Sequence, residues 1–370
     1  MKDLYIGLMS GTSADGIDAA LVDFSRPVPA VEATYYTPYA QELKNKILAL
    51  CHRGENEIHR LGELDVLLGK EFASAVNHLL NKNSIRPQSI KAIGSHGQTV
   101  RHHPHPPFRF TLQIGDPNTI AAETGITTVA DFRRKDIAHG GQGAPLVPAF
   151  HQHVFASAAV HRAIVNIGGI ANATILKRNH PDVIGFDTGP GNVLMDAWIH
   201  LHHNQNHDTN GAWGAQGTLH TELLASLLKH DFFQLPPPKS TGREQFHLEW
   251  LNSQLRPFAK NIPAADVQTT LVELTARSII ESVQQQLSGG EILVCGGGTH
   301  NAFLMSRLRD LAAPRFIVDT TIKYGLDPDW IEATAFAWLA RQTINRKTGN
   351  LPGATGASKA VILGGIYYGS

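Results

Sequence analysis

The stretch LYIGLMSGTSADGIDAALVDF, residues 4–24, decides the fold. Leu4–Met9 and Ile17–Phe24 are apolar runs, and a short segment rich in glycine and small polar residues separates them. This pattern predicts two strands joined by a tight loop. Farther along, Leu43–Leu50 and Ile58–Leu80 carry apolar residues at helical spacing, and Ser89–Ile93 indicates a buried strand. Strands that alternate with helices are typical of an α/β architecture.

A second cycle of the same kind follows in the other half of the chain. Ala163–Ile167 and Ala173–Leu176 predict strands, and a turn of small residues lies between them. The proline- and glycine-rich stretch Gly140–Pro145 falls between the two cycles and indicates a boundary. We therefore expect one domain over residues 1–145 and a second over 146–350, with the tail 351–370 returning to the first.

Composition excludes several classes of protein. The 370 residues include 32 basic and 32 acidic side chains, which gives no electrostatic reason to expect binding to nucleic acid or to an anionic membrane. Only Cys51 and Cys295 are present, so a disulfide scaffold and a cysteine-based zinc site are excluded. No apolar run approaches the roughly 20 residues of a membrane helix. Neither histidine cluster, at 102–105 or at 200–207, matches the zinc-protease pattern of two His at i, i+4 with an intervening Glu, so solvated surface histidines are favoured over a metal site. We expect a cytoplasmic protein.

The loop Gly11–Asp18 is the first of four glycine-rich segments that follow apolar runs. Glycines let backbone N–H groups converge on an anion, and Thr12 and Ser13 add hydroxyl donors. Asp15 and Asp18 supply the oxygen ligands that hydrated Mg²⁺ prefers. No Gly-Lys-Ser/Thr follows, so this is not a Walker loop. A plain hairpin turn favours the same residue types and stays open as an alternative.

The other three segments carry different side chains. We expect Asp187 to end a strand just before a helix that starts near Asn192, which suits a general base, although a helix cap is the alternative. Three glycines after a strand, Gly296–Gly298, permit close approach to a flat ligand such as adenine or ribose. The polar side chains of Gly94–Thr99 suit a sugar better than a phosphate.

Together these segments resemble the anhydro-N-acetylmuramic acid kinase family, within the superfamily of sugar kinases, actin and heat-shock chaperone ATPases. The resemblance covers essentially the whole chain. It is carried by Met9–Asp18, Gly94–Thr99, Asp131-Phe132-Arg133, Gly140–Leu146, Asn166–Asn172, Gly185–Asn192, Cys295–Asn301 and Leu351–Ala357. The fold that it implies is two actin-like (ribonuclease H-like) α/β domains hinged around a nucleotide cleft.

The resemblance also implies a reaction and a site. The family converts ATP, water and 1,6-anhydro-N-acetylmuramate to N-acetylmuramate 6-phosphate and ADP, in the recycling of cell-wall sugars. Asp187 would be the base, and Asp15 and Asp18 would hold Mg²⁺ through water molecules. The residues implied to bind ATP are Gly11, Thr12, Ser13, Ala14, Asp15, Gly16, Ile17, Asp18, Gly168, Gly169, Asn172, Gly189, Gly191, Asn192, Gly296, Gly297, Gly298 and Asn301. A homodimer is implied by the resemblance alone.

The same resemblance places the substrate contacts. The sugar carries a lactyl carboxylate, which calls for arginine or for helix N-terminal amides. Arg133 and Arg134 are the candidates for that contact, and a surface ion pair is the alternative for either. His96, Gln98 and Thr99 are expected to contact the sugar. Glu332 interrupts an apolar helical face and could reach the sugar or the attacking water, while spacing alone favours a solvated position.

Three other functions stay open at this point. A kinase of the same fold could phosphorylate a different sugar, with Asp187 deprotonating a hydroxyl directly. An actin- or chaperone-like ATPase would instead use nucleotide to change shape for a protein partner. A serine hydrolase built on Ser95 or Ser13 would need a strained Gly-x-Ser-x-Gly elbow, which the sequence lacks.

Overall fold

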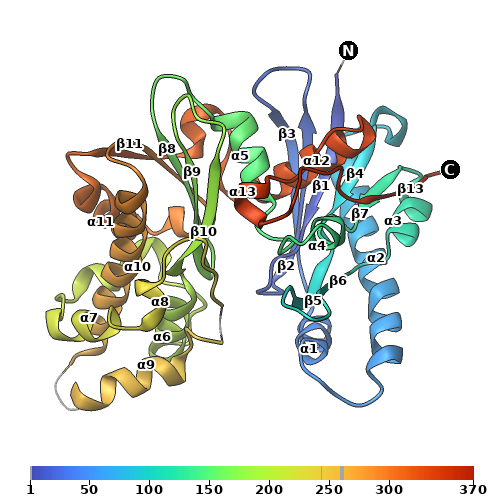
Figure 1. The fold of residues 1–370 in the computed structure, drawn as a ribbon. Coiled ribbons are helices and arrows are strands. Elements are labelled where there is room, and N and C mark those ends of the chain that lie inside the picture. Colours follow the sequence, from blue (N-terminus) through green and yellow to red (C-terminus); the bar gives the residue numbers. More distant parts are fainter. Residues whose placement is uncertain (1, 243, 259–261) are drawn as a thin grey trace. The chain divides into compact units, whose positions relative to one another are not determined.

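The computed structural model describes residues 2–242, 244–258 and 262–370, which form two compact units (Figure 1). Unit 1 comprises Met1–Val154 and Tyr324–Ser370, and unit 2 comprises Phe155–Lys323. The expected boundaries differ from these, because residues 146–154 and 324–350 belong to unit 1 rather than to the second domain. Residues 351–370 also lie in unit 1. Among the described residues, no helix has both the length and the apolar character that a membrane crossing requires.

Unit 1 is built on a six-stranded sheet with the order β13-β7-β4-β1-β2-β3. The strands are β1 (Leu4–Met9), β2 (Gly16–Asp23), β3 (Ala30–Pro38), β4 (Ala92–Ser95), β7 (Thr128–Ala130) and β13 (Gly365–Tyr367). Strands β1, β4 and β7 are parallel, whereas β2 pairs antiparallel with β1, as the opening stretch of sequence predicts. The carboxyl ends of the three parallel strands therefore meet at one edge of the sheet, where ligands bind in open α/β sheets.

One helix explains why the end of the chain returns to unit 1. Helix α12 (Ile331–Ile344) packs across β1, β2, β4 and β7, as Figure 1 shows for β1 and β4. Its backbone approaches so closely that a Cβ on Gly7 would collide with the carbonyl oxygen of Ala333, and a Cβ on Gly94 with that of Phe336. Only glycine fits at these two strand positions, and the contact fixes the start of α12 beside the strand ends.

The remaining elements of unit 1 cover the sheet and extend its edge. Helices α1 (Gln41–Leu50) and α2 (Glu57–Lys82) match the expected helical segments, and their buried faces join the apolar cluster of β1 and β2. The other elements are α3 (Pro117–Thr124), α4 (Arg134–Ala138), α5 (Val147–Phe155), α13 (Pro352–Thr355) and the hairpin of β5 (Gln98–His103) and β6 (Phe110–Ile114). The expected strand Ser89–Ile93 was wrong in position, because Pro87–Ser89 forms a 3₁₀ turn and β4 begins at Ala92.

Unit 2 has a five-stranded sheet with the order β10-β9-β8-β11-β12. The strands are β8 (Arg162–Ile167), β9 (Ile170–Leu176), β10 (Val183–Pro190), β11 (Gly290–Cys295) and β12 (Phe316–Thr320). Strands β8, β11 and β12 are parallel, and β9 forms the expected antiparallel return beside β8. The carboxyl ends of β8, β10 and β11 therefore lie at the same edge of this sheet.

The helices of unit 2 enclose a core of its own. They are α6 (Val193–His203), α7 (Thr221–Leu227), α8 (Asp231–Gln234), α9 (Leu248–Leu255), α10 (Ala264–Gln286) and α11 (Ala302–Ala312). The long helix α10 contributes a nearly continuous buried face, and every buried member of this apolar cluster lies between Ala163 and Val318. The mixed α/β class expected from the sequence is thus confirmed in both units.

Candidate active site

The loop between β1 and β2 is held in shape by hydrogen bonds around Ser10. The buried Ser10 hydroxyl lies 2.7 Å from Gln98 Oε1 and 2.9 Å from the carbonyl oxygen of Gly16, and the Tyr39 hydroxyl donates to it over 3.0 Å. Gln98 Nε2 donates to the carbonyl oxygen of Gly11 over 3.1 Å. Gln98, which we expected to contact sugar, therefore uses both its amide oxygen and its amide nitrogen to bind the loop.

The residues of this loop divide into packed and open positions. Ala14 is buried with a positive φ of 50°, and a Cβ on Gly16 would collide with the carbonyl oxygen of Thr37. A Cβ on Gly11, by contrast, would meet nothing closer than 3.7 Å, and Thr12 is exposed. Asp15 is also exposed and forms an ion pair with Lys44. The open side of the loop thus presents backbone, hydroxyl groups and one lysine.

Asp18 and Glu332 bring negative charge to the same strand edge. Asp18 lies opposite Met9 in the β1–β2 ladder, and Glu332 is in the first turn of α12. Burial, together with the negative charges of Glu332 and Asp329, raises the pKa of Asp18 to about 7. Burial also raises the pKa of Glu332, which the charge of Arg133 opposes. Glu332 is half-buried, and therefore less exposed than the solvated position that its spacing favours.

Arg133 contacts His96 and also interacts electrostatically with Glu332. Its Nη2 is 2.9 Å and its Nε 3.3 Å from His96 Nε2, and its Nη1 donates to the carbonyl oxygen of Gly143 over 2.7 Å. Burial, together with the charge of Arg133, lowers the pKa of His96 to about 3, so the imidazole is neutral. Its Nδ1–H then donates to the carbonyl oxygen of Gly97 over 2.7 Å, and Nε2 is left as an acceptor for Arg133.

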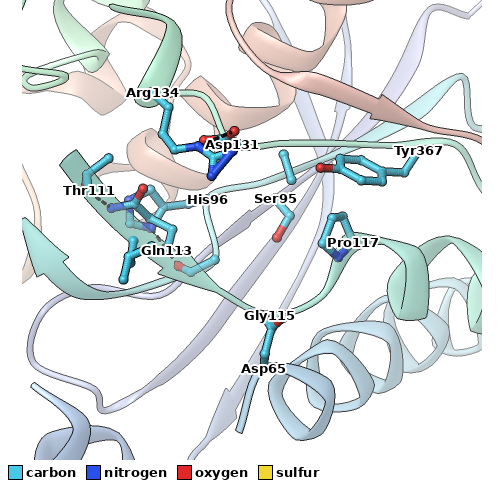
Figure 2. Close-up of a pocket in the computed structure, with 13 residues that line it drawn as sticks. Asp65, Ser95, His96, Thr111, Gln113, Gly115, Pro117, Asp131, Arg134 and Tyr367 are labelled. Atoms are coloured by element: carbon cyan, nitrogen blue, oxygen red, sulfur yellow. Dashed lines mark hydrogen bonds and ion pairs between the residues drawn. The ribbon is translucent and has the colours of Figure 1, made fainter. Parts of the chain in front are cut away.

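A polar cavity of about 140 Å³ opens beside these residues in unit 1 (Figure 2). Arg134 lies at its rim, is largely exposed, and pairs with Asp131 over 2.9 Å, which is the surface ion pair considered as its alternative role. Ser95 lines the cavity and is fully buried, while the neighbouring His96 is committed to Arg133. Thr99 lies outside the cavity lining, and its hydroxyl accepts from Gln113 Nε2 over 3.1 Å. No base activates Ser95 as a hydrolase nucleophile among the described residues.

In unit 2, Asp187 lies within β10 and not at its end. It faces Asn172 of β9 in the ladder, immediately before a bulge, and is therefore not a helix cap. Its Oδ2 accepts from the backbone N–H of Thr241 over 2.9 Å. The pKa of Asp187 is raised to about 6, mainly by burial and also by the charge of Glu244, while the hydrogen bond from the N–H of Thr241 limits the rise. A carboxylate with this pKa is ionised near neutral pH and still has appreciable proton affinity, as a general base requires.

The glycine segments of unit 2 pack against one another at the strand ends. The carbonyl oxygens of Gly168 and Gly169 accept from the backbone N–H groups of Asn192 and Gly191 over 2.8 and 2.9 Å. A Cβ on Gly191, Gly296 or Gly298 would collide with neighbouring atoms, and Gly189 combines a φ of 143° with a close contact to Phe233. Gly168 and Gly297 have open space instead, with no atom closer than 3.7 Å to a Cβ built on them.

A larger cavity of about 420 Å³ lies next to these glycine segments, wholly within unit 2. It is lined by Asn192, Met195, Asp196, His207, Asp208, Thr209, Asn210, Gly297, His300 and Asn301. Asn301 also caps α11, because its Oδ1 accepts from the N–H of Leu304 over 2.9 Å. Three of the lining residues, Gly297, His300 and Asn301, belong to the segment Cys295–Asn301, which the family resemblance implies to lie along the adenosine.

The structure adds residues that the sequence did not single out. Lys44 pairs with Asp15, Thr241 donates to Asp187, and Asp208 accepts from the N–H groups of Trp213 and Gly214 beside the larger cavity. These partners lie far from the motifs along the chain or in segments without a recognisable pattern. Among the described residues, no group of three or more His, Cys, Asp or Glu is arranged to hold a metal ion.

Comparison with known proteins decides the family. The family model described as anhydro-N-acetylmuramic acid kinase matches residues 3–369. The chain belongs to the anhydro-N-acetylmuramic acid kinase family. It is 54% identical over 366 residues to the anhydro-N-acetylmuramic acid kinase of Shewanella oneidensis, covering 99% of each chain. It is 52% identical over 370 residues to that of Coxiella burnetii strain Dugway 5J108-111, covering 100% of this chain and 98% of the relative.

Among solved structures, the chain is similar to the activator of 2-hydroxyisocaproyl-CoA dehydratase from Clostridium difficile with bound ADPNP. The TM-score is 0.47 and the identity 10%, with 90% of this chain and 92% of the other covered. Membership of the anhydro-N-acetylmuramic acid kinase family makes the chain a kinase that uses ATP. The structure thus has to account for a nucleotide site, a sugar site and a base.

Proposed function

We propose that this chain opens the 1,6-anhydro bridge of 1,6-anhydro-N-acetylmuramate and phosphorylates O6, using ATP and water. The products are N-acetylmuramate 6-phosphate and ADP, as in the recycling of cell-wall sugars. The observation that carries the proposal is Asp187, a half-buried carboxyl group whose pKa lies near 6, in a chain that the family model matches over residues 3–369. A carboxylate of this kind suits removal of a proton from water.

The chemistry balances with one base. Asp187 removes a proton from the water molecule as the water oxygen forms a bond to the anomeric carbon, and positive charge builds on the sugar. The bond between that carbon and O6 breaks. O6 then bonds to the γ-phosphorus while the bond from that phosphorus to the β-phosphate oxygen breaks, and ADP leaves. No proton has to be taken from a 6-hydroxyl group.

We assign the sugar and phosphate contacts to unit 1. Arg133 is held by His96 and Gly143, and each of its terminal nitrogens carries a second N–H that can donate to the lactyl carboxylate. The side chains of His96 and Gln98 support this site by holding Arg133 and the Gly11 loop. Arg134 and Thr99 stay as expected sugar contacts, and Arg134 reaches the cavity of Figure 2.

We assign the nucleoside to the larger cavity of unit 2. Gly297 and Asn301 line it, and the open position at Gly168 leaves room for a phosphate beside the strand ends. The helix α6 begins directly after Asn192, so its first N–H groups favour negative charge there. In unit 1, the open side of Gly11–Ser13 adds backbone and hydroxyl donors for the remaining phosphate oxygens.

The carboxyl oxygens around Asp18 fit a magnesium ion that is carried with the nucleotide. The Asp18 carboxyl group is destabilised as an anion by burial and by the charges of Glu332 and Asp329, and a cation would relieve that repulsion. Asp18 would hold the ion through water, whereas Asp15 is turned to Lys44. When bound, Mg²⁺ neutralises charge on the transferring phosphoryl group. Family resemblance further supports a cytoplasmic location and a homodimer, and light scattering on the purified protein tests the dimer.

An isotope experiment tests the reaction. The protein is incubated with ATP, Mg²⁺ and 1,6-anhydro-N-acetylmuramate in ¹⁸O-labelled water, and the products are analysed by mass spectrometry. We expect a phosphorylated sugar that carries the label at the anomeric oxygen. Unlabelled product added to labelled water after the reaction controls for exchange. Phosphorylation of a different sugar in a panel would overturn the substrate, and ADP without a phosphorylated sugar would favour a partner-driven ATPase.

A further inference from the structure

The proposed chemistry leaves one fully buried carboxyl group without a role. Asp136 is in α4, three residues after Arg133, and its side chain is 0% exposed. Its Oδ2 accepts from the backbone N–H of Gly143 over 2.8 Å. Its Oδ1 accepts from Asn350 Nδ2 over 2.6 Å and from the Thr355 hydroxyl over 2.7 Å. Three donors on one buried carboxylate offset the loss of its hydration.

The peptide group of Gly143 links Asp136 to Arg133. Its N–H donates to Asp136, while its carbonyl oxygen accepts from Arg133 Nη1 over 2.7 Å. Gly143 has a φ of 70°, and a Cβ there would lie 2.9 Å from Ile137 Cγ1. A Cβ on Gly141 would collide with Asp136 Oδ2. The loop is thus fitted around the carboxylate, and the carboxylate fixes the oxygen that holds the guanidinium.

The end of the chain completes this arrangement. The N–H of Gln142 donates to the carbonyl oxygen of Thr355 over 2.8 Å, and the N–H of Ser358 donates to that of His139 over 2.9 Å. Together with the bonds from Asn350 and Thr355 to Asp136, these contacts clamp loop 139–143 between α4 and residues 350–358. Two segments more than 200 residues apart in sequence therefore support one arginine.

We propose that Asp136 is a positioning residue, which holds Arg133 in place for the substrate carboxylate through loop 139–143 and the C-terminal segment 350–358. The inference rests on the proposed function of Arg133. Without this support, the guanidinium is free to turn toward the opposing charge of Glu332, with which it interacts electrostatically. A bidentate contact to a carboxylate tolerates little misplacement, so substrate binding weakens before the chemistry does.

The test weakens the support without touching Arg133. Thr355→Val removes one hydrogen bond to Asp136, and Thr355→Ser keeps the hydroxyl. Thr343→Val is the matched control, because Thr343 is a buried threonine of unit 1 whose hydroxyl bonds to the carbonyl oxygen of Leu363 and not to Asp136. We expect Thr355→Val to raise the KM for the anhydro sugar about tenfold, which corresponds to about 1.4 kcal/mol. The kcat and the KM for ATP should change less than twofold, and the other two variants should keep the wild-type KM.

Two further measurements separate positioning from general destabilisation. In an Arg133→Ala background, Thr355→Val should cause no further loss in kcat/KM for the sugar, because the two residues act in series. The proposal would be overturned if Thr355→Val lowered kcat/KM for the sugar by the same factor in the wild-type and Arg133→Ala backgrounds. It would also be overturned if Thr343→Val raised the KM for the sugar as much as Thr355→Val does. The ¹⁵Nε relaxation of Arg133 should show greater side-chain mobility in Thr355→Val. If Arg133→Ala leaves the KM for the sugar unchanged, the assigned role of Arg133 fails, and unchanged relaxation in Thr355→Val still overturns the support by Asp136 separately.

Discussion

At the scale of single residues, two half-buried carboxyl groups have raised pKa values but differ in their surroundings. Asp187 in unit 2 accepts a hydrogen bond from Thr241, and burial is the main reason for its pKa of about 6. Asp18 in unit 1 is both half-buried and repelled by the charges of Glu332 and Asp329, and its pKa is about 7. The surroundings of Asp187 suit a base that removes a proton, whereas the surroundings of Asp18 suit a site that attracts a cation.

The pH dependence of the reaction should report Asp187. The base acts as a carboxylate, so kcat/KM for the anhydro sugar should fall as the pH decreases through about 6. Asp187→Asn should lower kcat roughly 100-fold or more while ATP still binds, and its residual activity should lack this acidic limb. Steady-state rates between pH 5 and 9 provide the measurement. A variant within a few-fold of wild type would remove Asp187 as the base.

The same substitution should not weaken the fold. Because the folded state raises the pKa of Asp187, ionisation destabilises the folded protein by at most about 3 kcal/mol, and this destabilisation appears as pH rises from about 4 to above 6. Asp187→Asn should therefore have a Tm equal to or above that of wild type at pH 7.5. The difference should shrink toward pH 4. A lower Tm at pH 7.5 would show that the side chain stabilises the fold.

Asp18 and Asp15 should separate when each is changed to asparagine. Asp18→Asn removes a half-buried charge from the set that includes Glu332, so the Mg²⁺ concentration for half-maximal activity should rise at least fivefold. Asp15→Asn breaks only an exposed ion pair with Lys44, which is worth about 1 kcal/mol or less. The Mg²⁺ concentration for half-maximal activity should therefore change less than twofold in this variant. Magnesium titrations at fixed ATP compare the two. Equal responses would contradict the assignment of the ion to Asp18.

Sequence reasoning at the residue scale found side chains better than it found their partners. Asp187 is recognisable because a carboxyl group between apolar and glycine-rich residues is unusual, but its contact with Thr241 depends on folding across 54 residues. Gln98 was assigned to the sugar because an amide in a polar motif has the same appearance whether it faces a ligand or its own loop. Asp136 had no signal at all, since its partners Asn350 and Thr355 lie near the other end of the chain.

At the scale of elements, neighbouring glycines in one motif have different roles. In the turn after β11, a Cβ on Gly298 would collide with the side chain of Ile167, so this glycine allows the turn to pack on β8. Gly297 lines the 420 Å³ cavity, and a Cβ there would lie 3.8 Å from Asn192 Nδ2. Neither role can be read from the sequence, where the two residues are adjacent and identical.

Alanine at these two positions should therefore give opposite results. Gly298→Ala overpacks a buried contact and should destabilise the protein by about 1–3 kcal/mol, seen as a lower Tm. Gly297→Ala should leave the Tm within about 2 °C of wild type, because its methyl group enters the cavity, and should raise the KM for ATP severalfold. Thermal unfolding and ATP kinetics on both variants decide this. A normal KM for ATP in Gly297→Ala would place the nucleoside elsewhere.

At the scale of the whole molecule, the sequence predicts two α/β cycles but not where each unit ends. The stretch Gly140–Pro145 has the composition of a linker, yet Gly141 and Gly143 are buried beside the Asp136 carboxylate and belong to the interior of unit 1. Helix α12 was assigned to the second domain because it follows that domain in sequence. Its docking depends on Gly7 and Gly94, which leave room for its backbone and lie more than 230 residues earlier.

Unit 2 is one continuous segment, and this makes its independence testable. Its apolar cluster is drawn entirely from its own residues, and ion pairs such as Arg162–Glu291 and Arg307–Glu273 also form within it. We expect residues 155–323, expressed alone, to unfold in one cooperative thermal transition, because a segment with its own core meets the requirement for a domain. The 420 Å³ cavity lies inside this segment, so the fragment should still bind ATP in calorimetry, and the Gly297→Ala fragment should bind it more weakly. A fragment without a cooperative transition would show that unit 2 depends on unit 1 for its stability. A folded fragment that does not bind ATP would contradict the nucleoside assignment.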